Sequence, residues 1–244
     1  MKILGIIPAR YASTRFPGKP LIDIQGKSMI QRVYEQASKC KSLSAVVVAT
    51  DDDRIFSHVQ SFGGKVVMTS FDHPSGTDRC MEALQKFGGN YDVVVNIQGD
   101  EPFIQPEQLE QLISCFNSAD AQIATLAKKI DIVEDLLNVN LPKIIFNQNH
   151  TALYFSRSPI PGQKTMNHKA WLKAHTYYRH IGLYGYRTEV LNEITKLQPS
   201  PLEKTESLEQ LRWLEAGYTI KVGITELETV AIDTPEDLAK IQTK

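Results

Sequence analysis

The chain has 244 residues, of which 42% are apolar and 23% charged, and its 27 basic and 28 acidic side chains nearly cancel. This composition is typical of a globular protein, and the lack of a basic excess argues against a dedicated nucleic-acid-binding protein. No apolar run approaches the roughly 20 residues that span a bilayer. The three cysteines lie too far apart for a disulfide framework or a zinc site; they are Cys40, Cys80 and Cys115. Together with the charge balance, these observations lead us to expect a cytoplasmic protein with neither nucleic-acid nor membrane partners.

The first 127 residues alternate short apolar runs with helical patterns. The apolar runs predict strands buried on both faces of a parallel sheet, at Ile3–Ile7, Ala45–Ala49, Lys65–Met68, Asp92–Ile97 and Ile123–Ala127. The segments between them predict helices over 28–38, directly after 51–53, over 78–87 and over 106–117. This repeated pattern of a strand, a crossover helix and another strand predicts a doubly wound, mostly parallel α/β sheet.

The pattern loosens between residues 131 and 187. Short β-like runs at 143–146, 152–155 and 181–186 surround a polar segment, 162–175, without clear periodicity. The remaining chain predicts a helix over 205–216, strands at 219–224 and 229–232, and a last helix from Pro235. We therefore expect a single domain, 1–244, in which 131–187 is an inserted, small β-rich subregion.

The loop directly after the first strand is basic. Arg10, Arg15 and Lys19 follow that strand within ten residues, with small residues such as Ser13 between them. Small residues allow backbone N–H groups to approach an anion, and the three cations compensate its charge. The loop therefore predicts a polyphosphate-binding site, with an ordinary solvated basic loop as the alternative. It is neither a P-loop nor a dinucleotide-binding glycine motif.

Carboxylates at strand ends are candidate ligands for Mg²⁺. Asp100 follows the strand 92–97, and Asp233 lies where the last helix begins. Mg²⁺ usually takes one or two protein carboxylates and completes its shell with phosphates and water. Helix capping explains Asp233 equally well, and it explains Asp51–Asp53 more simply than a metal does.

Two further signals are weaker. The loop 69–79 has hydroxyls and a glycine before a helix, which favours phosphate or base recognition, although a capped helix start is the simpler interpretation. Alternation along a strand places His180 and Tyr184 on one face, where a single histidine is more often structural than functional. The six histidines have no metal-ligand spacing.

Eight segments occur in the order found in the 3-deoxy-manno-octulosonate cytidylyltransferase family, which the chain resembles over essentially its whole length. They are 8–21, 49–55, 69–79, 96–102, 152–161, 179–187, 199–217 and 231–238. The resemblance implies a Rossmann-like nucleotidyltransferase that transfers CMP from CTP to 3-deoxy-D-manno-octulosonate (Kdo) and releases pyrophosphate, with Mg²⁺ as cofactor. It also implies a cytosolic homodimer whose product, CMP-Kdo, serves lipopolysaccharide biosynthesis, and it implies that the subregion 131–187 serves sugar binding or dimerisation.

The same resemblance implies roles for residues at matching positions. Catalytic roles fall to Arg10, Arg15, Lys19 and Asp100. Nucleotide-binding roles fall to Ala9, Arg10, Ser13, Arg15, Lys19, Ser75, Gly76, Thr77, Arg79 and Asp100. The residues expected around Kdo are Gln98, Arg157, His180, Tyr184, Glu209 and Gln210, with Arg157 a candidate for its carboxylate. Asp100 and Asp233 are expected to bind Mg²⁺.

Three other functions remain open from the residues. A cytidylyltransferase for a different acidic sugar would have much the same basic loop. A metal-dependent glycosyltransferase also uses a strand-end carboxylate, but it has no need of the Arg10–Lys19 cations and releases no pyrophosphate. A catalytically silent nucleotide-sensing module would bind CTP without turnover, and the presence of both candidate metal carboxylates argues against it.

Overall fold

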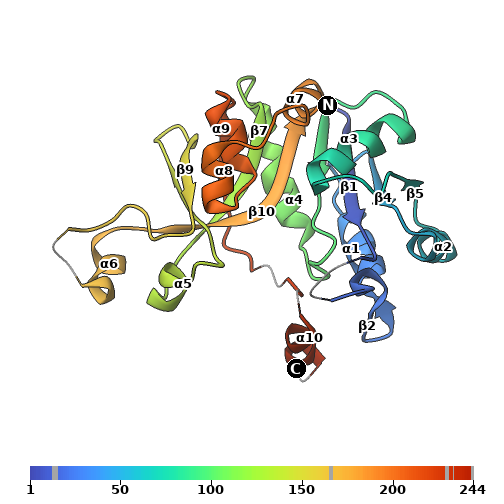
Figure 1. Cartoon of the computed structure of the whole chain (residues 1–244), viewed down its shortest axis with the longest axis horizontal. Coiled ribbons are helices and arrows are strands. Elements are labelled where there is room, and N and C mark those ends of the chain that lie inside the picture. The colour runs from blue at the N-terminus through green and yellow to red at the C-terminus, as the bar shows by residue number, and fades with distance from the viewer. Residues whose placement is uncertain (13–15, 165–166, 229–230, 233, 243–244) are drawn as a thin grey trace. The chain divides into compact units, whose positions relative to one another are not determined.

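A computed structural model describes residues 1–12, 16–164, 167–228, 231–232 and 234–242 (Figure 1). The chain divides into two compact units. The first comprises residues 1–110, 185–195 and 228–244, and the second comprises 111–184 and 196–227. Of the subregion predicted at 131–187, residues 131–184 lie in the second unit.

The first unit is built on four parallel strands in the order β6-β1-β4-β5. Their bounds are β1 Ile3–Ala9, β4 Ala45–Thr50, β5 Val66–Met68 and β6 Val93–Asn96. Strand β1 is central: Gly5 lies opposite Val46 on one side, and Leu4 lies opposite Val94 on the other. Its apolar side chains are almost completely buried because helices cover a parallel sheet on both faces.

Three of the crossover helices begin at a side-chain cap. Ser28 precedes α1 (Met29–Ala37), Asp52 precedes α2 (Asp53–Ser61), and Ser75 precedes α3 (Gly76–Phe87). In each case the cap oxygen accepts a backbone N–H from the first turn, where no intrahelical partner exists. The capping interpretation of the acidic run 51–53 is therefore confirmed for Asp52.

The first unit also contains several shorter elements. They are η1 Lys19–Leu21, β2 Asp23–Ile24, β3 Lys27–Ser28, α7 Thr188–Ile194 and α10 Pro235–Gln242. The helix α4 (Pro106–Ser114) begins in this unit.

The second unit combines parallel and antiparallel strands. β7 (Ile123–Lys129) pairs in parallel with β11 (Ile220–Ile224). β8 (Lys143–Phe146) runs antiparallel to β9 (Ala152–Ser156) and to the start of β10 (Tyr178–Arg187). Its helices are η2 Cys115–Asn117, α5 Val133–Leu137, α6 His168–Ala174, α8 Pro201–Glu206 and α9 Gln210–Glu215.

Two predicted elements are wrong. The helix predicted over 205–216 is two helices, because Ser207 adopts a left-handed conformation with φ of 52° and ends α8. The strand predicted at 229–232 does not form at 231–232, and 229–230 lie outside the described residues. None of the helices in the described ranges has both the length and the apolar character needed to cross a bilayer.

Candidate functional site

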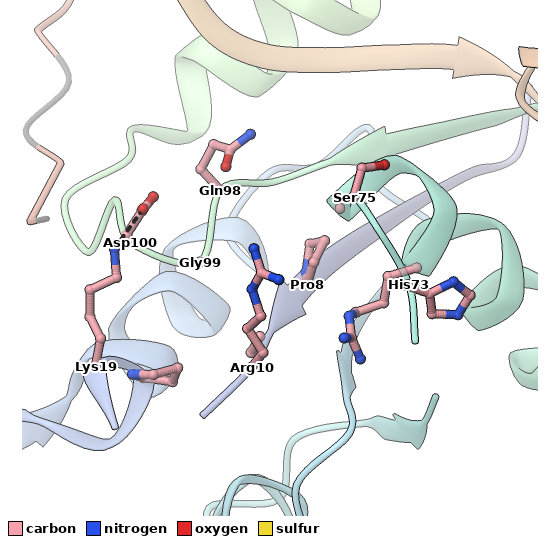
Figure 2. A pocket seen from close by; sticks show the side chains of 12 residues that line it. Pro8, Arg10, Lys19, His73, Ser75, Gln98, Gly99 and Asp100 are labelled. Carbon is pink, nitrogen blue, oxygen red and sulfur yellow. Dashed lines mark hydrogen bonds and ion pairs between the residues drawn. The ribbon is translucent and has the colours of Figure 1, made fainter. Parts of the chain in front are cut away.

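A cavity of about 250 Å³ opens in the first unit where β1 and β6 end and α3 begins (Figure 2). Three regions far apart in the sequence meet there, because the carboxyl ends of parallel strands share one edge of a sheet. The residues lining it are Pro8, Ala9, Arg10, Lys19, Pro20, His73, Ser75, Gly76, Arg79, Gln98, Gly99 and Asp100. This set contains most of the residues predicted to bind nucleotide, together with Gln98.

Lys19 and Asp100 form an ion pair on the cavity wall. The Lys19 Nζ donates to Asp100 Oδ2 at 2.8 Å, and the two side chains are 14% and 27% exposed (Figure 2). Arg10 is an exposed side chain at the end of β1, and in Figure 2 it extends toward the loop that carries Gln98 and Gly99. The cavity thus joins two cations and one carboxylate, all within reach of a ligand.

Gly99 lets two backbone segments touch beside the cavity. A Cβ on this residue would lie 2.7 Å from the carbonyl oxygen of Pro8, a contact that real Cβ atoms essentially never make. The neighbouring Ile97 N–H donates to Ile6 O at 2.8 Å, so the end of β1 and the loop after β6 are held together by their main chains. Glycine is therefore required at position 99 by the close approach of the Pro8 carbonyl. A left-handed backbone is not the reason, because the φ of Gly99 is not positive.

The N-terminus of α3 forms another wall. Ser75 accepts from the Asp78 N–H at 3.2 Å and donates to Asp78 Oδ2 at 2.6 Å. Gly76, the first helical residue, lines the cavity, whereas Thr77 is buried and is not among the lining residues. The aligned N–H groups at such a helix end favour an anion.

Arg79 lines the cavity but its guanidinium has internal partners. Nη2 lies 2.9 Å from Asp51 Oδ2, and Nη1 donates to Thr69 Oγ1 at 2.6 Å. The Arg79 and Asp51 side chains are only 4% and 6% exposed. The predicted nucleotide contact stays a prediction, while the observed role of this arginine is to join α3 to the ends of β4 and β5.

His73 is a lining residue that the sequence did not single out. Its Nε2 donates to the carboxylate of Glu82 on α3. Burial opposes ionisation of Glu82, but hydrogen bonds from Lys86, the Ser70 N–H and His73 outweigh it and lower the pKa of Glu82 to about 2. The only signal in the sequence was the position of His73 in the loop 69–79.

Three predicted site residues, Ser13, Arg15 and Asp233, lie outside the described residues. The residue before Asp233 is described: the Ile232 N–H donates to the Asp100 carbonyl at 2.9 Å. Ile232 is fully buried in a cluster with Ile24 and Met29. Among the described residues, no group of three or more metal-binding side chains occurs.

The other residues predicted around Kdo belong to the second unit. Arg157 donates to three backbone carbonyls: Nε to Glu206 at 2.6 Å, Nη1 to Val139 at 3.0 Å and Nη2 to Ser207 at 3.0 Å. Three of its five N–H donors therefore hold loops in place. Its predicted contact with a sugar carboxylate stays a prediction that depends on the remaining two donors.

Gln210 is the first residue of α9 and is 4% exposed. Its Nε2 is buried and has no hydrogen-bond acceptor among the described residues. Buried amide groups are nearly always paired in folded proteins, so this donor indicates a missing partner. Glu209, directly before it, is half-buried at the N-cap position of the same helix.

His180 and Tyr184 contact each other on β10, with ring centroids 5.2 Å apart. Thr125 Oγ1 donates to the Leu183 carbonyl, which leaves its oxygen free to accept from His180 Nε2 at 3.0 Å. Burial among these neighbours lowers the pKa of His180 to about 3. His180 therefore packs against Tyr184 and hydrogen-bonds to Thr125, which is the structural role expected for a lone histidine on a strand.

The pKa of His180 predicts a pH dependence of stability. In the unfolded chain the His180 imidazole takes up a proton below about pH 6.5, whereas in the folded chain it takes up this proton only near pH 3. The free energy of unfolding should therefore fall as the pH decreases through this window, by up to about 1.4 kcal/mol per pH unit. Urea denaturation of His180→Gln should give a flatter profile than the wild type. Exposed His175→Gln is the control, and equal slopes for His180→Gln and wild type would contradict the prediction.

Comparison with known proteins gives consistent matches. The cytidylyltransferase family model matches residues 4–222. The chain is 64% identical over 241 residues to the 3-deoxy-manno-octulosonate cytidylyltransferase of Bacteroides thetaiotaomicron, covering 98% of this chain and 96% of the relative. The enzyme of the same name from Thermodesulfovibrio yellowstonii is 50% identical over 244 residues, with 98% and 96% covered.

Comparison with solved structures agrees with these sequence matches. The structure of CMP:2-keto-3-deoxy-manno-octonic acid synthetase complexed with CTP matches with a TM-score of 0.92 and 42% identity, covering 100% of this chain and 98% of that one. A 4-diphosphocytidyl-2C-methyl-D-erythritol synthase from Anaerococcus prevotii has a TM-score of 0.63 at 15% identity, covers 99% and 97% of the two chains, and shares the fold alone. The predicted mostly parallel α/β, Rossmann-like fold is confirmed.

Proposed function

This chain is a nucleotidyltransferase of the 3-deoxy-manno-octulosonate cytidylyltransferase family, and on that premise we propose that it transfers CMP from CTP to Kdo and releases pyrophosphate. The observation that carries the proposal is the cavity in which Arg10, Lys19 and Asp100 meet the N-terminus of α3. Cations and helix N–H groups favour a polyphosphate, and a carboxylate at the same wall favours its metal ion.

The reaction proposed is a direct displacement. A sugar hydroxyl oxygen bonds to the α-phosphorus of CTP, and the bond from that phosphorus to the oxygen bridging the β-phosphorus breaks. Pyrophosphate leaves with the electron pair, and the hydroxyl proton passes to solvent. The protein positions the two substrates and compensates developing charge through Arg10 and Lys19, so we expect no covalent enzyme intermediate.

The residues present fit Mg²⁺. Asp100 is a partly exposed carboxylate at a cavity wall, and an ion that completes its shell with phosphates and water needs few protein ligands. We propose that Asp100 would hold the ion together with Asp233, which follows Ile232 in the chain. The hydrogen bond from Ile232 N to Asp100 O supports this pairing. When bound, the ion supplies Lewis-acid polarisation of the phosphate oxygens and the attacking hydroxyl.

By likeness to the family, recognition of Kdo is proposed for Gln98, Arg157, His180, Tyr184, Glu209 and Gln210. The unpartnered Nε2 of Gln210 is the strongest support, because a hydroxyl-rich sugar acid supplies the acceptor it lacks. We also propose, by likeness to the family, that the protein is a cytoplasmic homodimer whose product serves lipopolysaccharide biosynthesis.

A pyrophosphate-release assay tests the function. With CTP and Mg²⁺, we expect turnover with Kdo and much less with sialic acid or methylerythritol phosphate. Equal rates with all three acceptors would contradict the assignment of Kdo. CTP binding without pyrophosphate release would indicate a silent sensor, and a nucleotidylated protein formed with CTP alone would contradict direct displacement.

Gly99→Ala should lower kcat/KM by about a hundredfold. The new Cβ collides with the Pro8 carbonyl, so the backbone beside Asp100 must shift, and displacements near 1 Å at a reacting centre have costs of this size. The same assay measures the effect. Gly162→Ala is the matched control, since nothing lies within 4 Å of a Cβ there. A Gly99→Ala enzyme with the wild-type kcat/KM would contradict the close-approach argument.

A further inference from the structure

Tyr11 connects the basic loop after β1 to a neighbouring helix. The Arg54 guanidinium carbon lies 3.3 Å from the centroid of the Tyr11 ring. The same ring contacts Gly18, where an added Cβ would lie 3.1 Å from it. The Tyr11 carbonyl also accepts the Gly18 N–H at 3.0 Å. The side chain and main chain of this one residue thus join Arg54 to the turn at Gly18.

The orientation of Arg54 is fixed although its side chain is 59% exposed. Its Nε donates to Asp52 Oδ1 at 3.0 Å, and its Nη2 donates to Asp52 Oδ2 at 2.6 Å. Such a two-point contact sets the plane of a guanidinium as well as its position. Asp52 is itself held, because it caps α2 through the backbone N–H groups of Arg54 and Ile55.

On the other side of Tyr11, the turn leads directly to Lys19. Gly18 has φ of 70°, a left-handed conformation that favours glycine, and it is the N-cap of η1. Lys19 is the next residue, its N–H donates to Phe16 O at 3.2 Å, and its Nζ reaches Asp100. The hydrogen bond between Gly18 and Tyr11 therefore helps set where Lys19 leaves the backbone.

We propose that Arg54 and Tyr11 form a stacked pair that positions Lys19 for the phosphates of CTP. Arg54 is a positioning residue, since it acts through Tyr11 and Gly18 and is not among the residues lining the cavity. The inference rests on the proposed function, because it takes CTP as the ligand of Lys19. Arg54→Met and Tyr11→Leu remove the same contact from opposite sides, so their effects should not add.

The test compares CTP affinity by calorimetry with the KM values for CTP and Kdo in the pyrophosphate assay. Arg54→Met and Tyr11→Leu should each weaken CTP binding about two- to fivefold, the size expected for loss of one exposed cation–π contact. The double variant should be no worse than either single one, and the KM for Kdo should stay unchanged. Tyr11→Phe, which keeps the ring, should recover most of the CTP affinity.

Lys65→Met is the matched control. Lys65 also lies over an aromatic ring, 5.8 Å from the centroid of Phe87, but neither residue lines the cavity. This variant should bind CTP as the wild type does. If Tyr11→Leu does not fold, the comparison of Arg54→Met with Tyr11→Phe decides, because the first must weaken CTP binding and the second must not.

Three results would overturn the stacked pair: unchanged CTP affinity in Arg54→Met, additive losses in the double variant, or equal rises in both KM values with a parallel fall in Tm. Failure of the proposed function looks different. A wild-type protein that binds CTP but releases no pyrophosphate with Kdo would overturn that function, while the calorimetric comparison still decides about Arg54 and Tyr11. A wild-type protein that binds no CTP would overturn both.

Discussion

Asp100→Asn is expected to lower kcat by roughly 10²–10³-fold, the loss typical of removing one electrostatic contact to a developing charge. Asparagine preserves the shape of the side chain and can still accept from Lys19, but it lacks the negative charge that the proposed metal site requires. The measurement is pyrophosphate release at saturating CTP and Kdo over a Mg²⁺ titration. Lys19→Ala should cause a loss of similar size, by removing a cation from the same wall.

Asp92→Asn is the matched control for Asp100→Asn. Asp92 lies just before β6, at the end opposite Asp100, where its carboxylate accepts the Lys2 N–H at 2.6 Å and is exposed. This control should keep the wild-type rate. An Asp100→Asn enzyme with a near-normal rate at saturating Mg²⁺ would show that Asp100 does not hold the metal.

Arg79→Met is expected to lower the free energy of unfolding by about 3–5 kcal/mol, the range for breaking a buried ion pair by removal of one partner. The reason is that Asp51, with its side chain only 6% exposed, would lose the guanidinium that pairs with its carboxylate in the interior. Urea denaturation at neutral pH measures the change. Replacing both residues by apolar ones, as in Asp51→Leu with Arg79→Met, should recover much of the loss.

An exposed ion pair provides the comparison for Arg79→Met. Lys129 Nζ and Asp131 Oδ1 are 3.1 Å apart and the two side chains are 50% and 65% exposed, so Lys129→Met should lower the free energy of unfolding much less than Arg79→Met does. A cost for Arg79→Met that is no larger than the cost for Lys129→Met would contradict the importance assigned to the buried pair.

Much of the first unit could be predicted because its signals are local. The uninterrupted apolar run at the start of β1 identifies a strand buried on both faces, and the acidic run 51–53 identifies a helix start. The site followed from one geometric rule: strand ends of a parallel sheet share an edge. That rule brought Lys19 and Asp100 together across 81 positions of sequence.

What could not be predicted depends on partners distant in the sequence. Nothing local to Arg79 says that Asp51 will neutralise it, and nothing local to Arg157 says that three carbonyls will accept from it. Ser207 looks like an ordinary helical position, yet its left-handed backbone divides the predicted helix. The need for glycine at position 99 appears only when the end of β1 lies against it.

The buried Nε2 of Gln210 has a consequence for selectivity. Because this donor has already lost its water, a ligand that offers it an oxygen gains a hydrogen bond without further desolvation of the donor, whereas a ligand without that oxygen leaves it unpaired. Sites of this kind reject analogues that lack the matching polar group far more strongly than apolar pockets reject a missing methylene. If Gln210 binds Kdo as proposed, sugar acids deoxygenated at the position that pairs with its Nε2 should be poor competitors even when they are smaller than Kdo.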